Sequence, residues 1–226
     1  MFNLPDFYQD LRSHFDATVA AAEPTVAQEL QRLRMAPFAS DPALTLRPCP
    51  LLVVSMKPYG APGLDYPFGW EERADTPGLH RWYDGGRGRS NFVQEADGLV
   101  RAVLEAMELR MEARFVPNTY ANFYRAQDAK QLRAFGLEAT DCIAFHRQIL
   151  AVVEPEVILC IGNGPAPSAY ALYRRLLGPA AERIISAAPR AKVKAFVADG
   201  RLIVGVPHLS YLRAEAVVPA VCSLIF

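Results

Sequence analysis

The sequence is poor in the residues that build metal centres and disulfide frameworks. Its four cysteines stand at positions 49, 142, 160 and 222, so no two form a CxxC pair, and Cys160 lies inside the apolar run EVILCIG. Because zinc and iron–sulfur sites need closely spaced ligands, we expect no metal site. Reduced, buried thiols are typical of cytoplasmic proteins, so a cytoplasmic location is expected.

The sequence also lacks an excess of charge and a long apolar run. Lysines plus arginines number 24, as do aspartates plus glutamates, so the formal net charge is zero. A neutral chain gives no general support for nucleic-acid binding, although a local basic patch is enough for it. No run of about 18 apolar residues is present, so no membrane-spanning helix is expected. The opening MFNLPDFYQD has no basic segment followed by an apolar one, so no signal peptide is expected.

What the sequence does contain is the pattern of an α/β protein. With 226 residues, of which 51% are hydrophobic, the chain is long enough for one good-sized core. Helical spacing over 6–34, interrupted at Pro24, predicts two helices, and the prolines at 37, 42 and 48 predict an extended connector over 35–50. We therefore expect one domain, with a helical extension and connector over 1–45 and an α/β core over 46–226.

Apolar strands alternate with amphipathic helices along this core. Strands are predicted at 51–56, 114–120, 155–162 and 202–206, and helices at 93–112, 139–153, 166–177 and 214–226. A turn at Asp199-Gly200 pairs the last strand with an antiparallel arm. This order predicts a three-layer α/β/α fold with a central four-stranded, mostly parallel sheet.

The loops that follow the predicted strands are expected to meet at one edge of the sheet. Right-handed crossovers align the carboxyl ends of parallel strands, and that edge is where α/β proteins usually bind ligands. The loops are 57–70, 117–125, 162–166 and 207–213. The long segment 57–92 is rich in aromatic residues, which disordered segments usually lack, so we expect it to be ordered and functional.

Three residues of these loops have the chemistry of a nucleobase pocket. Phe68 offers an aromatic face to a planar ring, and Asn118 offers a donor and an acceptor to a base edge. His208 can donate a hydrogen bond to a carbonyl or to a developing anion. Together they predict a pocket for a base that has been flipped out of its strand.

Four stretches of the chain resemble motifs of the uracil-DNA glycosylase superfamily, in the order in which that family has them. SMKPYG followed by YPFG resembles the first motif and its base-stacking phenylalanine, in the style of the single-strand-selective monofunctional uracil glycosylases. FVPNTYANFYR resembles the strand with the base-reading asparagine, CIAFHRQILAVVEPEVILCIGN the helix and third strand, and PHLSYLR the final, histidine-containing motif. The resemblance spans residues 51–213.

The resemblance implies a DNA glycosylase that hydrolyses the N-glycosidic bond of a uracil-like or deaminated base without a metal or organic cofactor. His208 would stabilise the anion of the departing base, and Asn118 would hold the edge of that base. Phe68 would stack on it, and such stacking contributes roughly 1–3 kcal/mol.

Further residues take their expected roles from the same motifs. Met56, Pro58 and Tyr59 would complete the substrate pocket, with Tyr59 where some family members exclude a 5-methyl group. Leu212 falls where the family places an intercalating leucine, and the neighbouring Ser210 and Arg213 would contact DNA.

Lys57 departs from the family pattern, which has Asp, Asn or Glu at this position to position or activate water. A protonated lysine has three donors and no acceptor. Three interpretations are open: a loop lysine that bonds nearby carbonyls or a phosphate, a lysine of lowered pKa that forms a Schiff base with an abasic sugar, or a different water site with Asp65 or Glu71 as the acceptor. With His208, Lys57 is thus a candidate catalytic residue.

DNA, single- or double-stranded, is the expected partner. Between residues 174 and 213, eight lysines and arginines are opposed only by Glu182 and Asp199, and such a flank can follow a phosphate backbone. Two other functions remain open: a catalytically silent module that binds damaged or single-stranded DNA, and an enzyme that acts on a small nucleoside or nucleotide.

Overall fold

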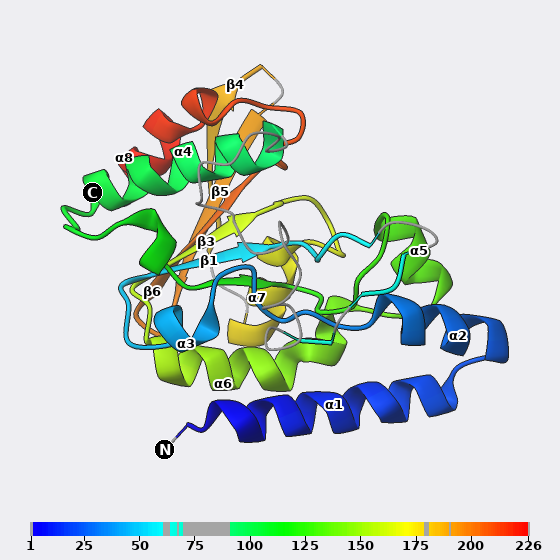
Figure 1. Cartoon of the computed structure of the whole chain (residues 1–226). Coiled ribbons are helices and arrows are strands. Elements are labelled where there is room, and N and C mark those ends of the chain that lie inside the picture. Colours follow the sequence, from blue (N-terminus) through cyan, green and yellow to red (C-terminus); the bar gives the residue numbers. More distant parts are fainter. Residues whose placement is uncertain are drawn as a thin grey trace.

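A six-stranded sheet lies at the centre of the protein (Figure 1). The structure is a computed structural model that describes residues 2–60, 64–66, 68–69, 91–178, 181–189 and 191–225. The strands are β1 (Leu51–Ser55), β2 (Asn118–Tyr120), β3 (Val157–Ile161), β4 (Arg183–Ala188), β5 (Ala191–Ala198) and β6 (Arg201–Val206). Their order in the sheet is β2-β1-β3-β6-β5-β4.

The parallel part of this sheet consists of the four predicted strands. β1 pairs with β2 and β3, and β3 pairs with β6, so the buried runs at 51–55, 157–161 and 203–206 lie side by side. Apart from Ser55 at the end of β1, these runs are apolar, because helices cover both faces of a parallel sheet. The α/β class and the mostly parallel sheet are thereby confirmed.

The prediction of four strands was wrong, because two antiparallel strands extend the sheet. β5 is the first arm of the predicted hairpin, which turns at Asp199 and Gly200, both with positive φ. β4 then pairs with β5 at the outer edge. None of the six residues of β4 is buried, and its sequence RIISAA holds only two strongly apolar residues, so no buried apolar run indicated this edge strand.

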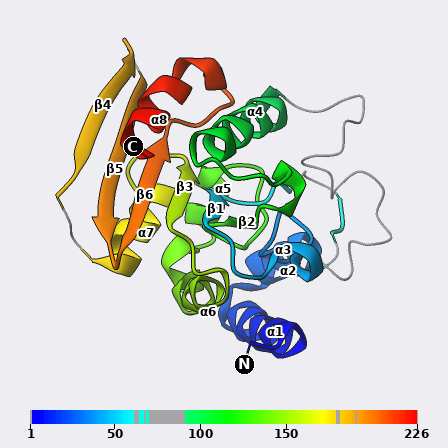
Figure 2. The ribbon, with the colours of Figure 1, turned by 90° about the vertical axis from the view of Figure 1, so that its left-hand side faces the viewer.

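Helices cover both faces of the sheet. They are α1 (Leu4–Ala21), α2 (Pro24–Leu33), α3 (Pro42–Thr45), α4 (Asn91–Ala106), α5 (Ala129–Ala134), α6 (Ile143–Val153), α7 (Ala169–Leu177) and α8 (Val218–Ile225), with 3-10 turns at Ala113–Phe115, Ala139–Cys142 and Ala214–Ala216. Figure 2 shows α4 and α8 on one face and α6 and α7 on the other. No helix of the described residues is long and apolar enough to span a membrane.

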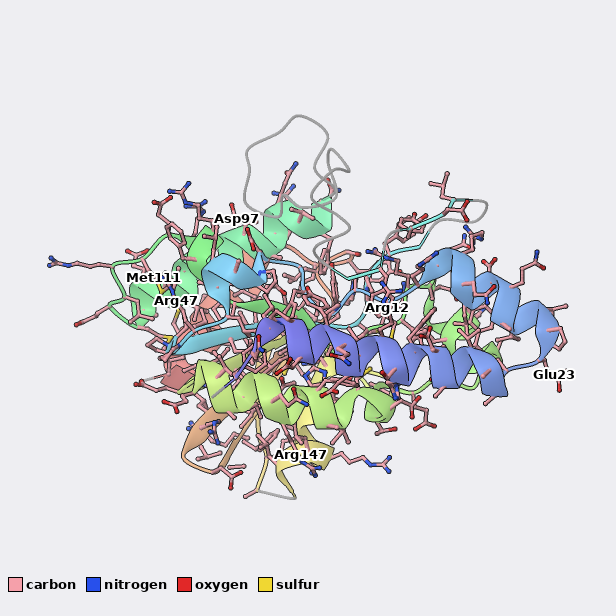
Figure 3. All side chains as sticks on the ribbon, turned by 60° about the horizontal axis from the view of Figure 1, so that its bottom comes forward. Arg12, Glu23, Arg47, Asp97, Met111 and Arg147 are labelled. Carbon is pink, nitrogen blue, oxygen red and sulfur yellow. The ribbon has the colours of Figure 1, made fainter. Side chains whose placement is uncertain are left out.

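The two N-terminal helices form as predicted, with Pro24 at the start of the second. Phe7, Leu11 and Phe15 form the buried face of α1. Figure 3 shows α1 lying along α6, where the Phe7 ring packs edge-on against Phe145 with centroids 5.6 Å apart. The helical extension is therefore part of the core, and it supports the layer of helices that lies beneath the sheet.

Candidate functional site

The loops after β1, β2, β3 and β6 meet at the carboxyl edge of the sheet, as predicted. With the first turn of α4 they line a cleft of about 1010 Å³. The residues that contribute to it include Ser55 at the end of β1 and Met56, Lys57 and Tyr59 after it, Tyr120 at the end of β2 and Asp128 after it, Asn163 after β3, His208, Ser210 and Tyr211 after β6, and Phe92 of α4.

The loop after β1 is held against the chain that follows β2. Beyond the last ladder pair, the N–H of Asn122 donates to the carbonyl of Met56 at 2.9 Å, and the N–H of Gly60 donates to the carbonyl of Ala126 at 3.1 Å. The buried guanidinium of Arg125 donates to the carbonyl of Tyr59 at 3.4 Å. These bonds place the SMKPYG segment on the wall of the cleft.

A buried histidine supports the same wall from below. His146 is 0% exposed, and its Nε2 lies 3.1 Å from the carbonyl of Ala121, which can only accept a hydrogen bond. Nε2 must therefore donate, which leaves Nδ1 to accept from the Tyr173 hydroxyl at 3.1 Å. Burial lowers the pKa of His146 to about 4, so this ring is neutral and structural.

Lys57 projects its amine onto the chain that follows β2. Nζ donates to the carbonyl of Ala126 and, at 3.3 Å, to that of Gln127. Burial lowers the pKa of the amine to about 8, although the carboxylate of Asp128 acts in the opposite direction. These carbonyl contacts agree with the interpretation of Lys57 as a loop lysine that bonds nearby carbonyls. Of the two substitute acceptors, Asp65 lies outside the cleft, beside Arg32, and Glu71 lies outside the described residues.

His208 is fixed in the cleft by two contacts. Its ring stacks on Phe92, with centroids 4.9 Å apart and an angle of 23° between the planes. Its Nδ1 accepts from the N–H of Ser210 at 3.3 Å, so the neutral ring carries its hydrogen on Nε2. Burial, and next the charge of Lys57, lower the pKa of His208. The neutral form with an Nε2–H donor is therefore favoured.

Asn163 provides an acceptor that sequence reasoning missed. Its Nδ2 donates to the carbonyls of Lys192 at 2.6 Å and Gly205 at 2.9 Å, and this fixes the orientation of the amide. Oδ1 accepts no hydrogen bond from any described residue and is available to a ligand. The only signal in the sequence was the position of Asn163 in the predicted loop after β3.

Two predicted pocket residues lie in the core instead of the cleft. Phe68 is 3% exposed and packs edge-on against Phe15 at 5.4 Å, beneath the guanidinium of Arg12 at 4.2 Å. Asn118 is 0% exposed because it begins β2, where it pairs with Val53, instead of ending it. Both side-chain atoms of Asn118 lack a hydrogen-bond partner among the described residues. The strand ends two residues later, so Tyr120 reaches the cleft.

The remaining predicted residues divide between the cleft and its surroundings. Met56, Tyr59 and Ser210 line the cleft. Pro58 is buried, and its carbonyl accepts from the N–H of Ala126 at 3.4 Å. Leu212 is half-buried and packs against the core. Arg213 is exposed and lies 3.7 Å from Glu215.

Neither a metal group nor a known relative marks this site. No three His, Cys, Asp or Glu side chains in the described part of the chain are placed to hold a metal ion. Comparisons of the chain with models of known protein families and with curated proteins find no match. The likeness to the uracil-DNA glycosylase superfamily therefore rests on the four motifs.

Proposed function

We propose that this protein is a DNA glycosylase of the uracil-DNA glycosylase type, which flips a uracil-like or deaminated base into the cleft and hydrolyses its N-glycosidic bond. The observation that carries the proposal is His208, held in the cleft as a neutral ring with its hydrogen on Nε2. Such a donor stabilises the oxygen of a departing base anion, typically by about 3 kcal/mol. The helices on both faces of the sheet fit a three-layer α/β/α fold of this type.

Other polar groups of the cleft suit a base that carries a carbonyl next to an N–H. Asn163 presents Oδ1 as an acceptor, and the buried hydroxyl of Ser55 has no hydrogen-bond partner among the described residues. With the donor of His208, these groups complement the edge of uracil, hypoxanthine or xanthine. Asn163 thus takes the role expected of Asn118.

The aromatic walls of the cleft come from residues other than Phe68. Phe92 and Tyr120 line it, and so does Tyr59. Aromatic rings at these positions can stack on a flipped base whatever its sequence context, and each stack contributes roughly 1–3 kcal/mol.

We assign the orientation of the attacking water to Asp128. Among the described residues that line the cleft, it carries the only carboxylate. Hydrogen bonds from the backbone N–H groups of Gln131 and Lys130 lower its pKa, so it is ionised at neutral pH and can accept a hydrogen bond from water. Protonated Lys57 has no acceptor for this task.

A basic strand beside the cleft suits DNA as the partner. Lys192 is exposed on β5, and its carbonyl is bonded to Asn163 of the cleft wall. Lys194 follows on the same strand, and Arg183 is exposed on β4. Their charges can attract a phosphate backbone toward the cleft. A cytoplasmic location, suggested by the free thiols, belongs to the same proposal.

A second candidate is a catalytically silent module that binds damaged or single-stranded DNA. Lys57 favours it, because a cation stands where the related enzymes have the residue that handles water. In that case the pocket recognises a flipped base and the basic strand holds the backbone, but no bond is broken.

Base release from defined oligonucleotides separates the two candidates. Single- and double-stranded oligonucleotides with uracil, hypoxanthine or xanthine are incubated with wild-type protein, His208→Ala, Lys57→Asn and the control Arg147→Ala. Arg147 is exposed on α6, outside the cleft (Figure 3). An enzyme releases base, loses at least about 100-fold in rate on His208→Ala, and is unaffected by Arg147→Ala.

Other outcomes support other functions. Tight binding of DNA without release of any base supports the silent module, and release by Lys57→Asn alone identifies a site that has lost its activity. Release from free deoxynucleosides but not from DNA supports an enzyme of small nucleosides.

A further inference from the structure

The amine of Lys57 is held in the geometry of a nucleophile. Its two hydrogen bonds go to the carbonyls of Ala126 and Gln127. A neutral amine has two hydrogens and one lone pair, so two carbonyl partners use both hydrogens and leave the lone pair for a third direction. Lys57 lines the cleft, so an electrophile bound there lies beside this amine.

The surroundings of Lys57 allow the free amine to form near neutral pH. Burial outweighs the attraction of Asp128, and the pKa falls from 10.5 to about 8. Among the described residues, the other groups that act on or lie over the amine are His208, which is neutral, and the ring of Tyr59, 5.9 Å from Nζ. Near pH 8, half of the protein therefore carries the unprotonated amine that nucleophilic attack requires.

No other lysine of the chain has this position. The four lysines are Lys57, Lys130, Lys192 and Lys194. Lys130 is exposed on α5, Lys192 is exposed on β5, and Lys194 follows it on that strand. None of these three lines the cleft, so a covalent bond formed inside the cleft can be assigned to one residue.

We propose that Lys57 forms a reversible imine with the aldehyde of an abasic deoxyribose bound in the cleft. The proposal rests on the proposed function, because release of a base leaves this sugar in the same place. The lone pair of Nζ attacks C1′ of the open-chain sugar, and a carbon–nitrogen bond forms. Both hydrogens of the amine leave with the carbonyl oxygen as water, and addition of water reverses the step. No oxidant or reductant takes part.

Borohydride trapping tests the imine directly. An oligonucleotide with a preformed abasic site is incubated with the protein and sodium cyanoborohydride, which reduces an imine to a stable amine. The variants are Lys57→Arg, which keeps the cation but forms no imine, and the matched control Lys130→Arg. Thermal unfolding of each variant shows that it is folded. The adduct is located by peptide mapping.

The expected adduct lies on the peptide that contains Lys57. Its rate of formation falls at least about tenfold in Lys57→Arg, is unchanged in Lys130→Arg, and rises with pH through a midpoint of about 8. Absence of an adduct, or an adduct on another lysine or the N-terminal amine, overturns the proposal.

Preformed abasic DNA keeps this test separate from the test of the glycosylase. Base release without trapping overturns the imine alone. Trapping without release of any base retains the imine and overturns the glycosylase.

Discussion

The ring of His208 stacks on Phe92, with centroids 4.9 Å apart and planes 23° apart. This contact joins the loop after β6 to the first turn of α4, two segments that are distant in the sequence. With the hydrogen bond from the N–H of Ser210 to Nδ1, it fixes both the plane and the tautomer of the ring. The chemistry proposed for the cleft depends on that orientation.

Loss of the stack is expected to slow base release without unfolding the protein. An aromatic pair contributes about 0.5–1.5 kcal/mol, so Phe92→Leu should lower the single-turnover rate by up to about tenfold. Phe92→Tyr, which keeps the ring, is the control and should retain nearly the full rate. Equal rates for the leucine variant and the wild type would show that Phe92 does not position His208.

Burial and the charge of Lys57 lower the pKa of His208. The rate of base release should therefore start to fall, as the pH is lowered, only below the ordinary histidine value of 6.5. Protonation places a hydrogen on Nδ1, where it opposes the N–H of Ser210 and disturbs the loop. Lys57→Gln removes a positive charge, so the pKa of His208 should rise. The loss of rate at low pH should then begin at a higher pH. The titration of His208 by NMR measures the shift, and movement toward acid would contradict this electrostatic explanation.

Strands β1, β3 and β6 and the converging loops could be predicted because these three strands are mostly apolar runs and right-handed crossovers align the strand ends. The site was harder to predict, because a strand boundary decides which side chain reaches the cleft. A shift of two residues moved Asn118 into the core and brought Tyr120 to the edge. The Phe92–His208 stack and the amide bonds of Asn163 join distant segments, and no local pattern indicates such contacts.

The loss of stability of the folded protein at acid pH should depend on His146. Its pKa is about 4 in the folded protein and close to 6.5 when unfolded, so the unfolded chain binds more protons between these values. The free energy of unfolding should therefore be unaffected by this group above pH 6.5 and should fall as the pH is lowered toward 4, by about 3 kcal/mol in total. Urea denaturation as a function of pH measures this change.

His146→Gln is the matched variant for that measurement. Glutamine keeps one donor and one acceptor but does not titrate, so the variant should lose less stability between pH 6.5 and 4 than the wild type does. An identical loss in both proteins would assign the acid sensitivity to other groups.

Two glycine substitutions should change stability in opposite directions. A Cβ at Gly60 would lie 2.7 Å from a methyl group of Leu33 and 3.2 Å from Cβ of Arg125, so Gly60→Ala should cost about 1–3 kcal/mol by overpacking. Gly98 lies within α4, and its nearest neighbour would be 4.0 Å away, so Gly98→Ala should stabilise the helix by about 0.5–1 kcal/mol. Thermal unfolding measures both changes in stability. An unchanged stability of Gly60→Ala would mean that the SMKPYG loop can shift to make room for the methyl group.

The most direct test of the proposed glycosylase is the rate of base release from a single-stranded oligonucleotide that contains one uracil. Wild-type protein should release uracil, and His208→Ala should release it at least about 100-fold more slowly while remaining folded and still binding the oligonucleotide. Release at an unchanged rate by His208→Ala would contradict the role of His208. If neither protein releases uracil, the cleft is not a site of uracil excision.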